Sequence, residues 1–541
     1  MRRGSNGFRE IFSRRISRRR MLTGMGKVGA GIAVIGLSGC AATGQISPAK
    51  KLDRLVFATS RDLEALDPHI STSIIDAMSF FPLMYDSLTI MQRDIRPGPN
   101  LAASWENPDE NTWLFKLRQG VKFHNGEDFD AQTAQFNVQR VLDPQTKSPH
   151  FRLVAAVEGV DAPDKYTLRM KTKAPDPILL SRLTDLFIIP KKYVEEKGIA
   201  IMKTSPVGSG PYQFVQWRKD EFIEAEKAAG THFRVPNPPA NVFVQRVVPQ
   251  AASRVALLVT KEADIAWSVP FEDFERIKKD PELDVFVDKV SSSYGEIWMS
   301  QLSKPLQDKR VRQAINYAVN KEEIVKSLFQ GSIAPIGQPA TPACFGYDDK
   351  IKAYPYDPKK ARDLLAAAGF PNGLEMDLYQ TTSGYVKYNE YMQAIANYLS
   401  EVGIKTTIRS IPEGFSGWMG RLRKDGSGPP AGLHHASSYC PFLDLSMTYI
   451  AYWVTWDEKT GLGNYMYISN PEIDRLTKEA QSTLDQKRRK EALGKISQLV
   501  HDEAYALFLF PIPWTWGYNK KKLKALHPRD TRLHAWDVEP A

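Results

Sequence analysis

The chain has 541 residues, of which 42% are hydrophobic and 25% are charged, and its formal net charge is +10. Nine Lys or Arg residues and one Glu fall within residues 1–39, a net +8, which leaves only +2 for the rest of the chain. Because the chain after residue 39 is nearly neutral, its charge gives little support for a nucleic-acid partner. About 500 residues exceed what one hydrophobic core usually holds, so two or three lobes are expected.

Residues 1–39 are predicted to be an export signal rather than part of the fold. An arginine-rich start runs into a mildly apolar, Gly- and Ala-rich stretch. The run around Arg18 and Arg19 resembles a twin-arginine signal, and Leu37-Ser38-Gly39-Cys40 resembles the lipobox at which a bacterial signal peptide is cut and the new N-terminal Cys is acylated. A transmembrane anchor is the alternative, but the apolar stretch is shorter than about 20 residues and is interrupted by glycines.

Two further cysteines, Cys344 and Cys440, lie 96 residues apart. In an exported protein they either pair or remain two unrelated buried thiols, and their spacing does not decide between these alternatives.

The first half of the chain alternates strands, turns and helices. Trp113, Phe115 and Leu117 alternate with polar or smaller neighbours, the period of a half-buried strand. Residues 131–142 are predicted to form a helix that stops at Asp143-Pro144, and residues 165–172 a strand. Residues 242–248, 251–259 and 263–267 are predicted as strand, helix and strand.

Near the middle lies Pro206-Val207-Gly208-Ser209-Gly210-Pro211-Tyr212, a turn that leads into an apolar, aromatic strand. It resembles the turn found in extracellular solute-binding proteins of the peptide, nickel and opine class, which serve ATP-driven importers. Residues 100–131, 309–318 and 361–370 resemble further signatures of that family, and the resemblance covers roughly residues 50–535. In the family, the chain returns at this turn to its first lobe after building an inserted one.

The second half is predicted to be richer in helices with clear caps. Asp308 and Asn320 are expected to cap two successive helices, and Asp357-Pro358 to open a third. A helix over 391–402 leads into a strand over 404–411, and residues 473–504 read as one amphipathic helical stretch. Residues 507–513 are predicted to be a buried strand that, by resemblance, crosses back to the first lobe.

The resemblance implies an α/β, periplasmic-binding-protein-like two-lobe fold (class II) with a third, inserted smaller α/β lobe. After the signal peptide, the expected boundaries are 40–88, 205–302 and 511–541 for a discontinuous first lobe, 89–204 for the inserted lobe and 303–510 for the second lobe. The crossovers between lobes are expected near Ser205 and Pro511.

In this family, the ligand lies between two lobes that close by a hinge. Position within the resemblance, together with the rigid faces that aromatic side chains offer, selects the candidates. They are Trp267, Tyr294, Trp418, His434, His435, Ser437, Ser438 and Tyr439. Eleven Trp residues are also a generous supply of core side chains, so each aromatic has a structural alternative.

The peptide binders of the family carry Trp-x-x-Asp-Tyr-x-Asp-Pro, whose first Asp pairs with the ligand's α-ammonium. Alignment on Tyr439 places Ser438 at that Asp and His435 at the Trp. A hydroxyl does not replace a carboxylate as the partner of a cation, so unmodified peptides are expected to bind weakly. Blocked peptides, opine-like conjugates, aromatic compounds or sugars then fit better. Asp444 is the substitute acid if the register slips.

Adjacent His434 and His435 are residue types that bind nickel, copper or zinc, but neighbours on a strand point to opposite faces. No metal site and no cofactor are therefore expected. Nothing in the chain resembles a nucleophile elbow, an HExxH helix or a Cys-x-x-Cys cluster, so no enzyme is expected.

The leading hypothesis is a monomeric, lipid-anchored substrate-binding component of an ABC importer. It is exported by the Tat machinery to the periplasmic or cell-surface side and hands a peptide-like or other small organic solute to a membrane permease. The alternatives are a non-transport ligand receptor, a metal-chelate (nickel-type) binder and, less favoured, an exported hydrolase.

Overall fold

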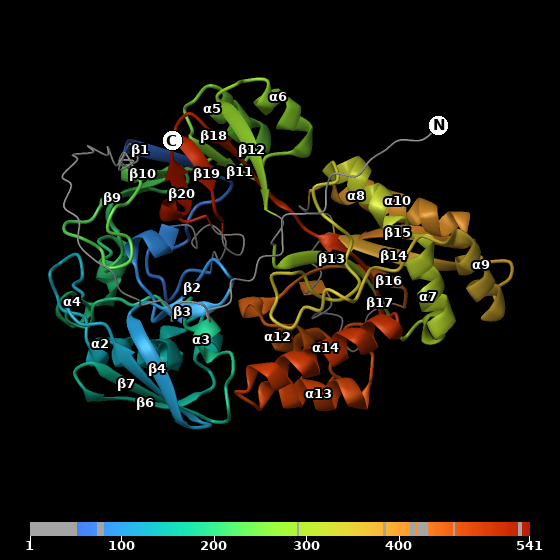
Figure 1. Cartoon of the computed structure of the whole chain (residues 1–541), viewed down its shortest axis with the longest axis horizontal. Helices are drawn as coiled ribbons and strands as arrows, with labels where there is room; N and C mark the ends of the chain where they lie inside the picture. Colours follow the sequence, from blue (N-terminus) through green and yellow to red (C-terminus); the bar gives the residue numbers. More distant parts are fainter. Residues whose placement is uncertain are drawn as a thin grey trace, which may run out of the picture. The chain divides into compact units, whose positions relative to one another are not determined.

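The computed structural model of the protein describes residues 51–72, 80–288, 291–381, 386–411, 417–418, 431–457, 460–461, 463–528 and 533–541. They belong to one unit that spans Ala49–Ala541. The predicted signal segment, with Arg18, Arg19 and Cys40, lies outside the described residues. Three sheets of four or more strands carry the architecture (Figure 1).

The seven-stranded sheet collects strands from distant parts of the chain. Its order is β12 (Leu283–Asp288), β18 (Trp514–Asn519), β11 (Ile265–Trp267), β1 (Leu52–Thr59), β10 (Ala240–Val247), β9 (Phe222–Lys227) and β8 (Tyr212–Arg218). β1 runs parallel to β10 and β11, and the remaining pairs are antiparallel. Helix α5 (Ala251–Val259) has the predicted bounds and packs on β11, and α6 (Phe274–Lys278) packs on β12.

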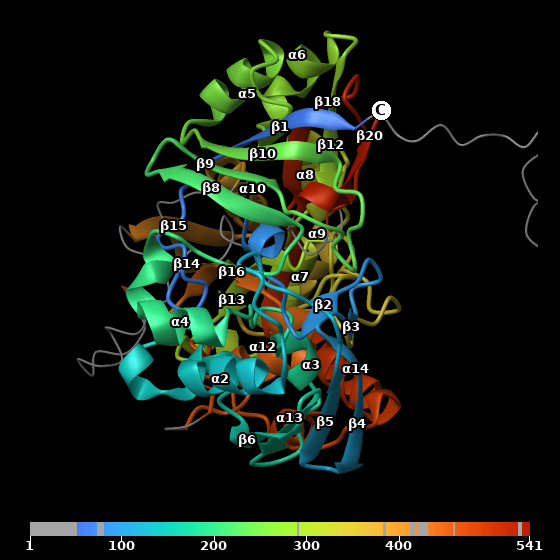
Figure 2. The same ribbon diagram turned by 90° about the vertical axis from the view of Figure 1, so that its left-hand side faces the viewer.

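A four-stranded antiparallel sheet is built from residues that lie between β1 and β8 in the sequence. Its order is β4 (Ala102–Asp109), β5 (Thr112–Leu117), β7 (Thr167–Thr172) and β6 (Val157–Asp164). Trp113, Phe115 and Leu117 are buried as predicted, and they join a core with α2 (Ala131–Leu142), which lies beside β6 (Figure 2). The small hairpin of β2 (Thr89–Met91) and β3 (Pro97–Pro99) precedes this sheet, and α3 (Leu179–Arg182) and α4 (Lys191–Lys197) follow it.

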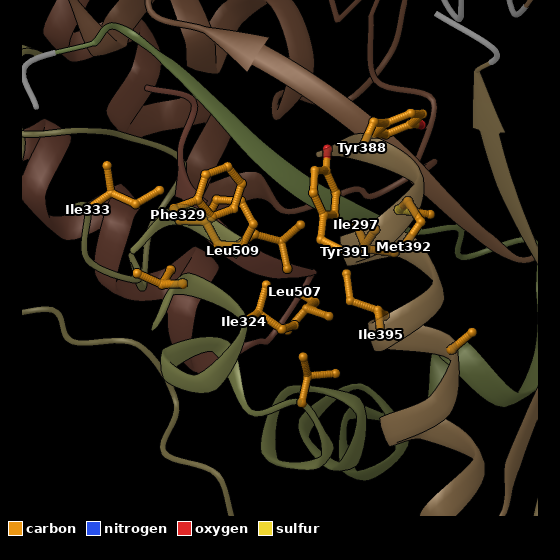
Figure 3. Packing of buried hydrophobic residues seen from close by; sticks show 14 of the residues in the cluster. Ile297, Ile324, Phe329, Ile333, Tyr388, Tyr391, Met392, Ile395, Leu507 and Leu509 are labelled. Carbon is orange, nitrogen blue, oxygen red and sulfur yellow. The ribbon is translucent and has the colours of Figure 1, made fainter. Parts of the chain in front are cut away.

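The five-stranded sheet has the order β15 (Ile404–Ile411), β14 (Leu374–Thr381), β16 (Leu433–Tyr439), β13 (Ser293–Met299) and β17 (Ala506–Pro511). Alternate residues of its strands enter two different cores. Ile297, Leu507 and Leu509 point toward α8 (Lys321–Phe329) and α10 (Tyr388–Glu401), as Figure 3 shows, and α7 (Lys309–Ala318) and α9 (Pro358–Ala367) extend that layer. Trp298 and Phe508 point the other way, toward α12 (Leu445–Tyr452) and two C-terminal helices.

Those C-terminal helices correct one expectation. Residues 473–504 are not one helical stretch but α13 (Pro471–Gln481) and α14 (Gln486–Asp502), and Asp485 caps the second by accepting from the amides of Lys487 and Arg488. Apolar side chains of both helices enter the same core. A single straight helix of that length, about 48 Å, could not bring its two halves to one core, so the chain turns back.

The chain passes between the seven-stranded and the five-stranded sheet twice: from β12 to β13, and from β17 to β18. The second crossover, at residues 511–514, lies at the expected Pro511. The first lies at residues 288–293, whereas Ser205 precedes β8, where the chain re-enters the seven-stranded sheet after the four-stranded one. Since β13 pairs with β16 and β17, the change of sheet also precedes the boundary expected at 302–303.

The glycine-rich turn before β8 packs closely against the backbone of Leu83 and Met84. A Cβ atom at Gly208 would lie 1.9 Å from the Met84 carbonyl oxygen, and one at Gly210 would lie 2.4 Å from the Leu83 carbonyl oxygen. Between them, the Ser209 hydroxyl donates to buried Asp86 (3.0 Å). Asp86 also contacts His232 (3.0 Å) and Arg234 (3.3 Å), so the turn is fixed by backbone contact and by buried charge.

Candidate ligand-binding site

The two crossovers bring the ends of several strands together. On the side of the seven-stranded sheet, Trp267 ends β11 and stacks on Trp514, with ring centroids 5.1 Å apart and planes inclined by 15°. On the side of the five-stranded sheet, Tyr439 ends β16 opposite Ser293, whose carbonyl accepts from the Ile512 amide (2.8 Å). Tyr439 is 41% exposed, so it presents an aromatic surface beside the crossovers.

Buried Arg254 holds the Trp267 end of this region. Its guanidinium donates to the carbonyls of Trp267 (2.7 Å) and Ser268 (3.2 Å) and, further back, to those of Val248 and Pro249 (both 2.8 Å). Four carbonyls therefore share one cation, which fixes the ends of β10 and β11 against each other.

Ser438, the residue aligned with the family's acidic anchor, is hydrogen-bonded to an acidic side chain on the neighbouring strand. Its hydroxyl donates to Glu296 Oε1 at 2.5 Å, from β16 to the neighbouring strand β13. Glu296 is fully buried, and burial raises its pKa to about 7, although the hydrogen bonds from Ser438 and Trp298 oppose that rise. Glu296 Oε2 makes no hydrogen bond of good geometry to any described residue. Within the described chain, this carboxyl thus lacks a full set of partners.

Tyr294 stands directly opposite Ser438 in the β13–β16 register and is also fully buried. Burial, followed by the charge of Glu296, raises the pKa of Tyr294 far above its usual value. Tyr294, Glu296 and Ser438 lie on the sheet face that packs on α12 and the C-terminal helices. The two predicted candidates are therefore neighbours, and Glu296 joins them.

Asp444, the alternative anchor, is already paired. Its two carboxylate oxygens accept from Arg489 Nη2 at 2.9 and 2.8 Å, and its side chain caps α12 through the Ser446 amide (3.0 Å). Both partners of this ion pair are buried. Removing either partner would leave a buried charge, so Asp444 has a structural role.

His435 points away from this face into the core against α10. Its Nδ1 lies 3.0 Å from the Tyr388 hydroxyl and its Nε2 lies 2.9 Å from the Tyr391 hydroxyl. The Thr381 amide donates to the Tyr388 hydroxyl, which can then donate to Nδ1, so the ring proton belongs on Nε2. Burial lowers the pKa of His435 to about 3, which makes it a neutral, hydrogen-bonded core residue.

His434 lies on the opposite face from His435, as expected for strand neighbours. Its ring centroid is 5.1 Å from that of Tyr379 and 6.3 Å from that of Trp418, so three aromatic rings gather at the end of β14. In the part of the chain that the structure describes, no group of three or more His, Cys, Asp or Glu side chains could hold a metal ion.

The eight predicted residues therefore fall into five places. Trp267 lies in the seven-stranded sheet, Tyr294 with Ser438 on one face of the five-stranded sheet, and His435 on its other face. Trp418 and His434 share an aromatic cluster, while half-buried Ser437 and exposed Tyr439 follow the strand toward the crossovers. Two residues that sequence reasoning did not select, Trp514 and Glu296, contact Trp267 and Ser438. Glu296 had a signal, because it is the one acid in the otherwise uncharged run Tyr294-Gly295-Glu296-Ile297-Trp298.

Comparison with known proteins gives this arrangement a context. Residues 96–428 match the family model for bacterial extracellular solute-binding proteins, family 5 middle region. The chain is 31% identical over 366 residues to the glutathione-binding protein GsiB of Pectobacterium atrosepticum, which covers 66% of this chain and 69% of that protein. It is 29% identical over 399 residues to GsiB of Escherichia coli strain K12, with 72% and 74% covered.

Solved structures share the fold. DppA from Helicobacter pylori in complex with the peptide STSA superposes with a TM-score of 0.69 at 24% identity, covering 91% of this chain and 98% of that one. NikZ from Campylobacter jejuni in complex with Ni(L-His) gives 0.70 at 23% identity (90% and 97%), and HbpA2 from Haemophilus parasuis gives 0.80 at 19% identity (90% and 100%).

A mixed α/β architecture with two crossovers between its larger sheets defines the class of two-lobe periplasmic binding proteins, so the expected fold class is confirmed. The chain belongs to family 5 of the bacterial extracellular solute-binding proteins. It is thus a substrate-binding component of an ABC importer, as predicted, and its relatives are binding proteins rather than enzymes. None of the helices in the described ranges is long and apolar enough to span a membrane.

Proposed function

We propose that this protein captures a peptide-like solute with a primary ammonium group between its two lobes and delivers it to a membrane permease without chemical change. The observation that carries this proposal is the contact between Ser438 and Glu296. The expectation of weak peptide binding rested on a missing carboxylate at Ser438, and the neighbouring strand supplies one. Carboxylate and hydroxyl together make an acceptor site for an ammonium group.

The electrostatics of Glu296 favour such a partner. Burial makes the ionised form of this carboxyl unfavourable, which is why its pKa is about 7. A cation bound beside the carboxylate offsets that desolvation cost. Tyr439, the next residue along β16, is exposed, which brings this end of the strand to the surface, but its side chain lies on the opposite face from Ser438. The ligand's ammonium reaches the buried pair on the face of Ser438 and takes over Oε2, while Ser438 keeps Oε1.

We propose that aromatic side chains on both sides of the crossovers enclose the rest of the ligand. Trp267, backed by Trp514, contributes from the first lobe, and Tyr439 contributes from the second. The first lobe is then the seven-stranded sheet, the inserted lobe the four-stranded sheet, and the second lobe the five-stranded sheet, with hinges at residues 288–293 and 511–514. His435 is assigned to the core of the second lobe and not to the ligand.

We also propose that the protein is held at the membrane surface by acylation of Cys40 after export through the Tat machinery, directed by Arg18 and Arg19. The support is the order of the two motifs in the sequence. A multiply acylated cysteine anchors a protein firmly, whereas one acyl chain is marginal.

Calorimetric titration tests the ligand class. Reduced glutathione is titrated because the relatives are glutathione-binding proteins. Unmodified tri- and pentapeptides are titrated beside their N-acetylated forms. A mixture of nickel and histidine tests a metal chelate as the ligand. The expected result is that at least one amine-bearing compound binds and that acetylation weakens it by about tenfold or more, or about 1.4 kcal/mol.

The variant Glu296→Gln should bind the free and acetylated forms equally. The matched control is Glu375→Gln, an exposed acid on β14 of the same sheet, which should leave both affinities unchanged. If the wild type binds the free and acetylated forms with equal affinity, Glu296 does not bind the ligand's ammonium group. If every peptide and glutathione fail to bind while nickel-histidine binds, the ligand class itself is wrong.

A further inference from the structure

We propose that Cys344 and Cys440 are joined by a disulfide in the exported protein, which ties the end of strand β16 to the segment that precedes Phe345. The sequence leaves pairing and separate burial equally open. The fold places the two cysteines in one core, because both are buried and both belong to the cluster under α12 and α14.

The backbone holds the two cysteine segments side by side. The Phe345 amide donates to the Leu443 carbonyl (2.7 Å), and the Leu445 amide donates to the Phe345 carbonyl (3.2 Å). This is a parallel bridge between Phe345 and Asp444, and Cys344 directly precedes Phe345. Cys440 is brought to the bridge by a tight turn, in which the Leu443 amide donates to the Cys440 carbonyl (3.1 Å).

The two thiols are neighbours in this core. The Cys344 thiol helps to raise the pKa of Cys440, and its sulfur lies 3.6 Å from the Thr341 hydroxyl oxygen. A disulfide needs Cβ atoms about 3.5–4.5 Å apart, a separation that the paired backbone segments make accessible.

The chemistry of the compartment favours the bond. Extracellular and periplasmic proteins, the class to which this family belongs, are exposed to oxidising conditions. The only other cysteine of the chain is Cys40, at the predicted acylation site, so Cys344 and Cys440 are left as a pair. The two thiols lose two protons and two electrons, the sulfur–sulfur bond forms, and a disulfide oxidant of the thiol-oxidoreductase or glutathione-disulfide class is reduced to two thiols.

Burial determines when this reaction takes place. Burial and the adjacent Cys344 thiol raise the pKa of Cys440, so the thiolate is scarce once the core has closed. Oxidation therefore requires the segment at 341–347 to open, because the docked thiol is rarely ionised. Once formed, the same burial protects the bond from reduction.

The cross-link acts beside the proposed ligand anchor. Cys440 follows Tyr439 directly, and its amide donates to the carbonyl of Ser292, a residue of the first crossover (3.0 Å). A bond from Cys440 to Cys344 fixes the end of β16 relative to that crossover. The proposal needs only export of the chain and does not depend on which solute binds.

Mass spectrometry of the full chain tests the bond. The protein is taken from the exported fraction of producing cells, unfolded without reductant in the presence of iodoacetamide, and digested. The expected result is one cross-linked peptide pair containing Cys344 and Cys440, with neither cysteine alkylated until a reductant is added. Alkylation of both cysteines before reduction would overturn the proposal, and no variant has to fold for that result.

Thermal unfolding gives an independent test. Closing a loop of about 100 residues should raise the midpoint by several degrees, so a reductant that reaches the unfolding protein should lower the wild-type midpoint by that amount. The double variant Cys344→Ala/Cys440→Ala should unfold at a lower temperature and should not respond to reductant. A wild-type midpoint that does not change with reductant contradicts the bond.

Discussion

Asp444, which caps α12, and Glu296, which lies on β13, are both buried carboxylates, but their surroundings differ. Asp444 faces the guanidinium of Arg489 and caps a helix, whereas Glu296 has only hydrogen-bonding neighbours among the described residues. A paired acid stabilises the fold, and an acid without a cation weakens it. This difference is why we assign ligand recognition to Glu296 and structure to Asp444.

The pH dependence of stability follows from Glu296. In the unfolded chain, its carboxyl has a pKa of 4.5, and in the folded chain the pKa is about 7. The folded state therefore binds more protons between these values, so stability falls as the pH rises from 4.5 through 7, by up to about 3 kcal/mol for this group. Glu296→Gln should lose less stability between pH 5 and pH 8 than the wild type.

Thermal midpoints of both proteins at pH 5 and pH 8 give the comparison, with Glu375→Gln as the control for removal of an exposed acid. If Glu296→Gln shows the same fall between the two pH values as the wild type, Glu296 is charged in the folded protein over the whole range and has a partner that we have not assigned.

The proposed membrane attachment depends on a single residue, Cys40, outside the described part of the chain. Cys40→Ala should release the protein into the soluble exported fraction, because the lipobox then lacks the cysteine that is acylated. Ligand affinity should not change. Fractionation by immunoblot and a titration with the wild-type ligand are the two measurements. A Cys40→Ala protein that stays wholly with membranes would contradict the lipid anchor.

At the scale of elements, much of the fold can be predicted because the signals are local. The bounds of α2 and the caps at Asp308 and Asn320 follow from side chains next to the helix ends. The break between α13 and α14 is set by the need to fill one core from two sides. The contact of Glu296 with Ser438 and the position of the crossover at 288–293 depend on which strands become neighbours. Residues far apart in the sequence determine that together, so local patterns do not predict it.

The glycine-rich turn gives a prediction at this scale. Gly210→Ala places a methyl group against the carbonyls of Leu83 and Met84, and two backbone segments cannot move apart cheaply, so we expect a loss of about 2 kcal/mol or more. Gly494→Ala is the matched control. It lies inside α14, and a Cβ there meets nothing within 4 Å, so it should stabilise the protein by about 0.5–1 kcal/mol.

Urea or thermal unfolding of the two variants beside the wild type is the measurement. If Gly210→Ala retains wild-type stability, the turn does not approach residues 83–84 closely, and close packing does not explain the two glycines at positions 208 and 210.

Across the protein as a whole, the segment that follows β16 reaches the core of the four-stranded sheet, the proposed inserted lobe. Phe442 packs against the core of the four-stranded sheet, with the Arg152 guanidinium 5.9 Å from its ring centroid, and Leu443 packs with Met91 of β2. Both Phe442 and Leu443 have left-handed backbone angles (φ 55° and 57°), which cost energy in residues other than glycine. A strained link from the anchor to another lobe suits a protein whose lobes rearrange when the anchor is filled.

We propose that the lobes close around a peptide-like solute, and small-angle X-ray scattering of the full mature chain tests this closure. Reduced glutathione is added at increasing concentration, while calorimetry under the same buffer conditions records saturation. We predict that the radius of gyration falls in step with binding and that Glu296→Gln, at the same glutathione concentrations, keeps the larger radius. A radius that stays constant while the wild-type protein saturates would contradict closure between the lobes.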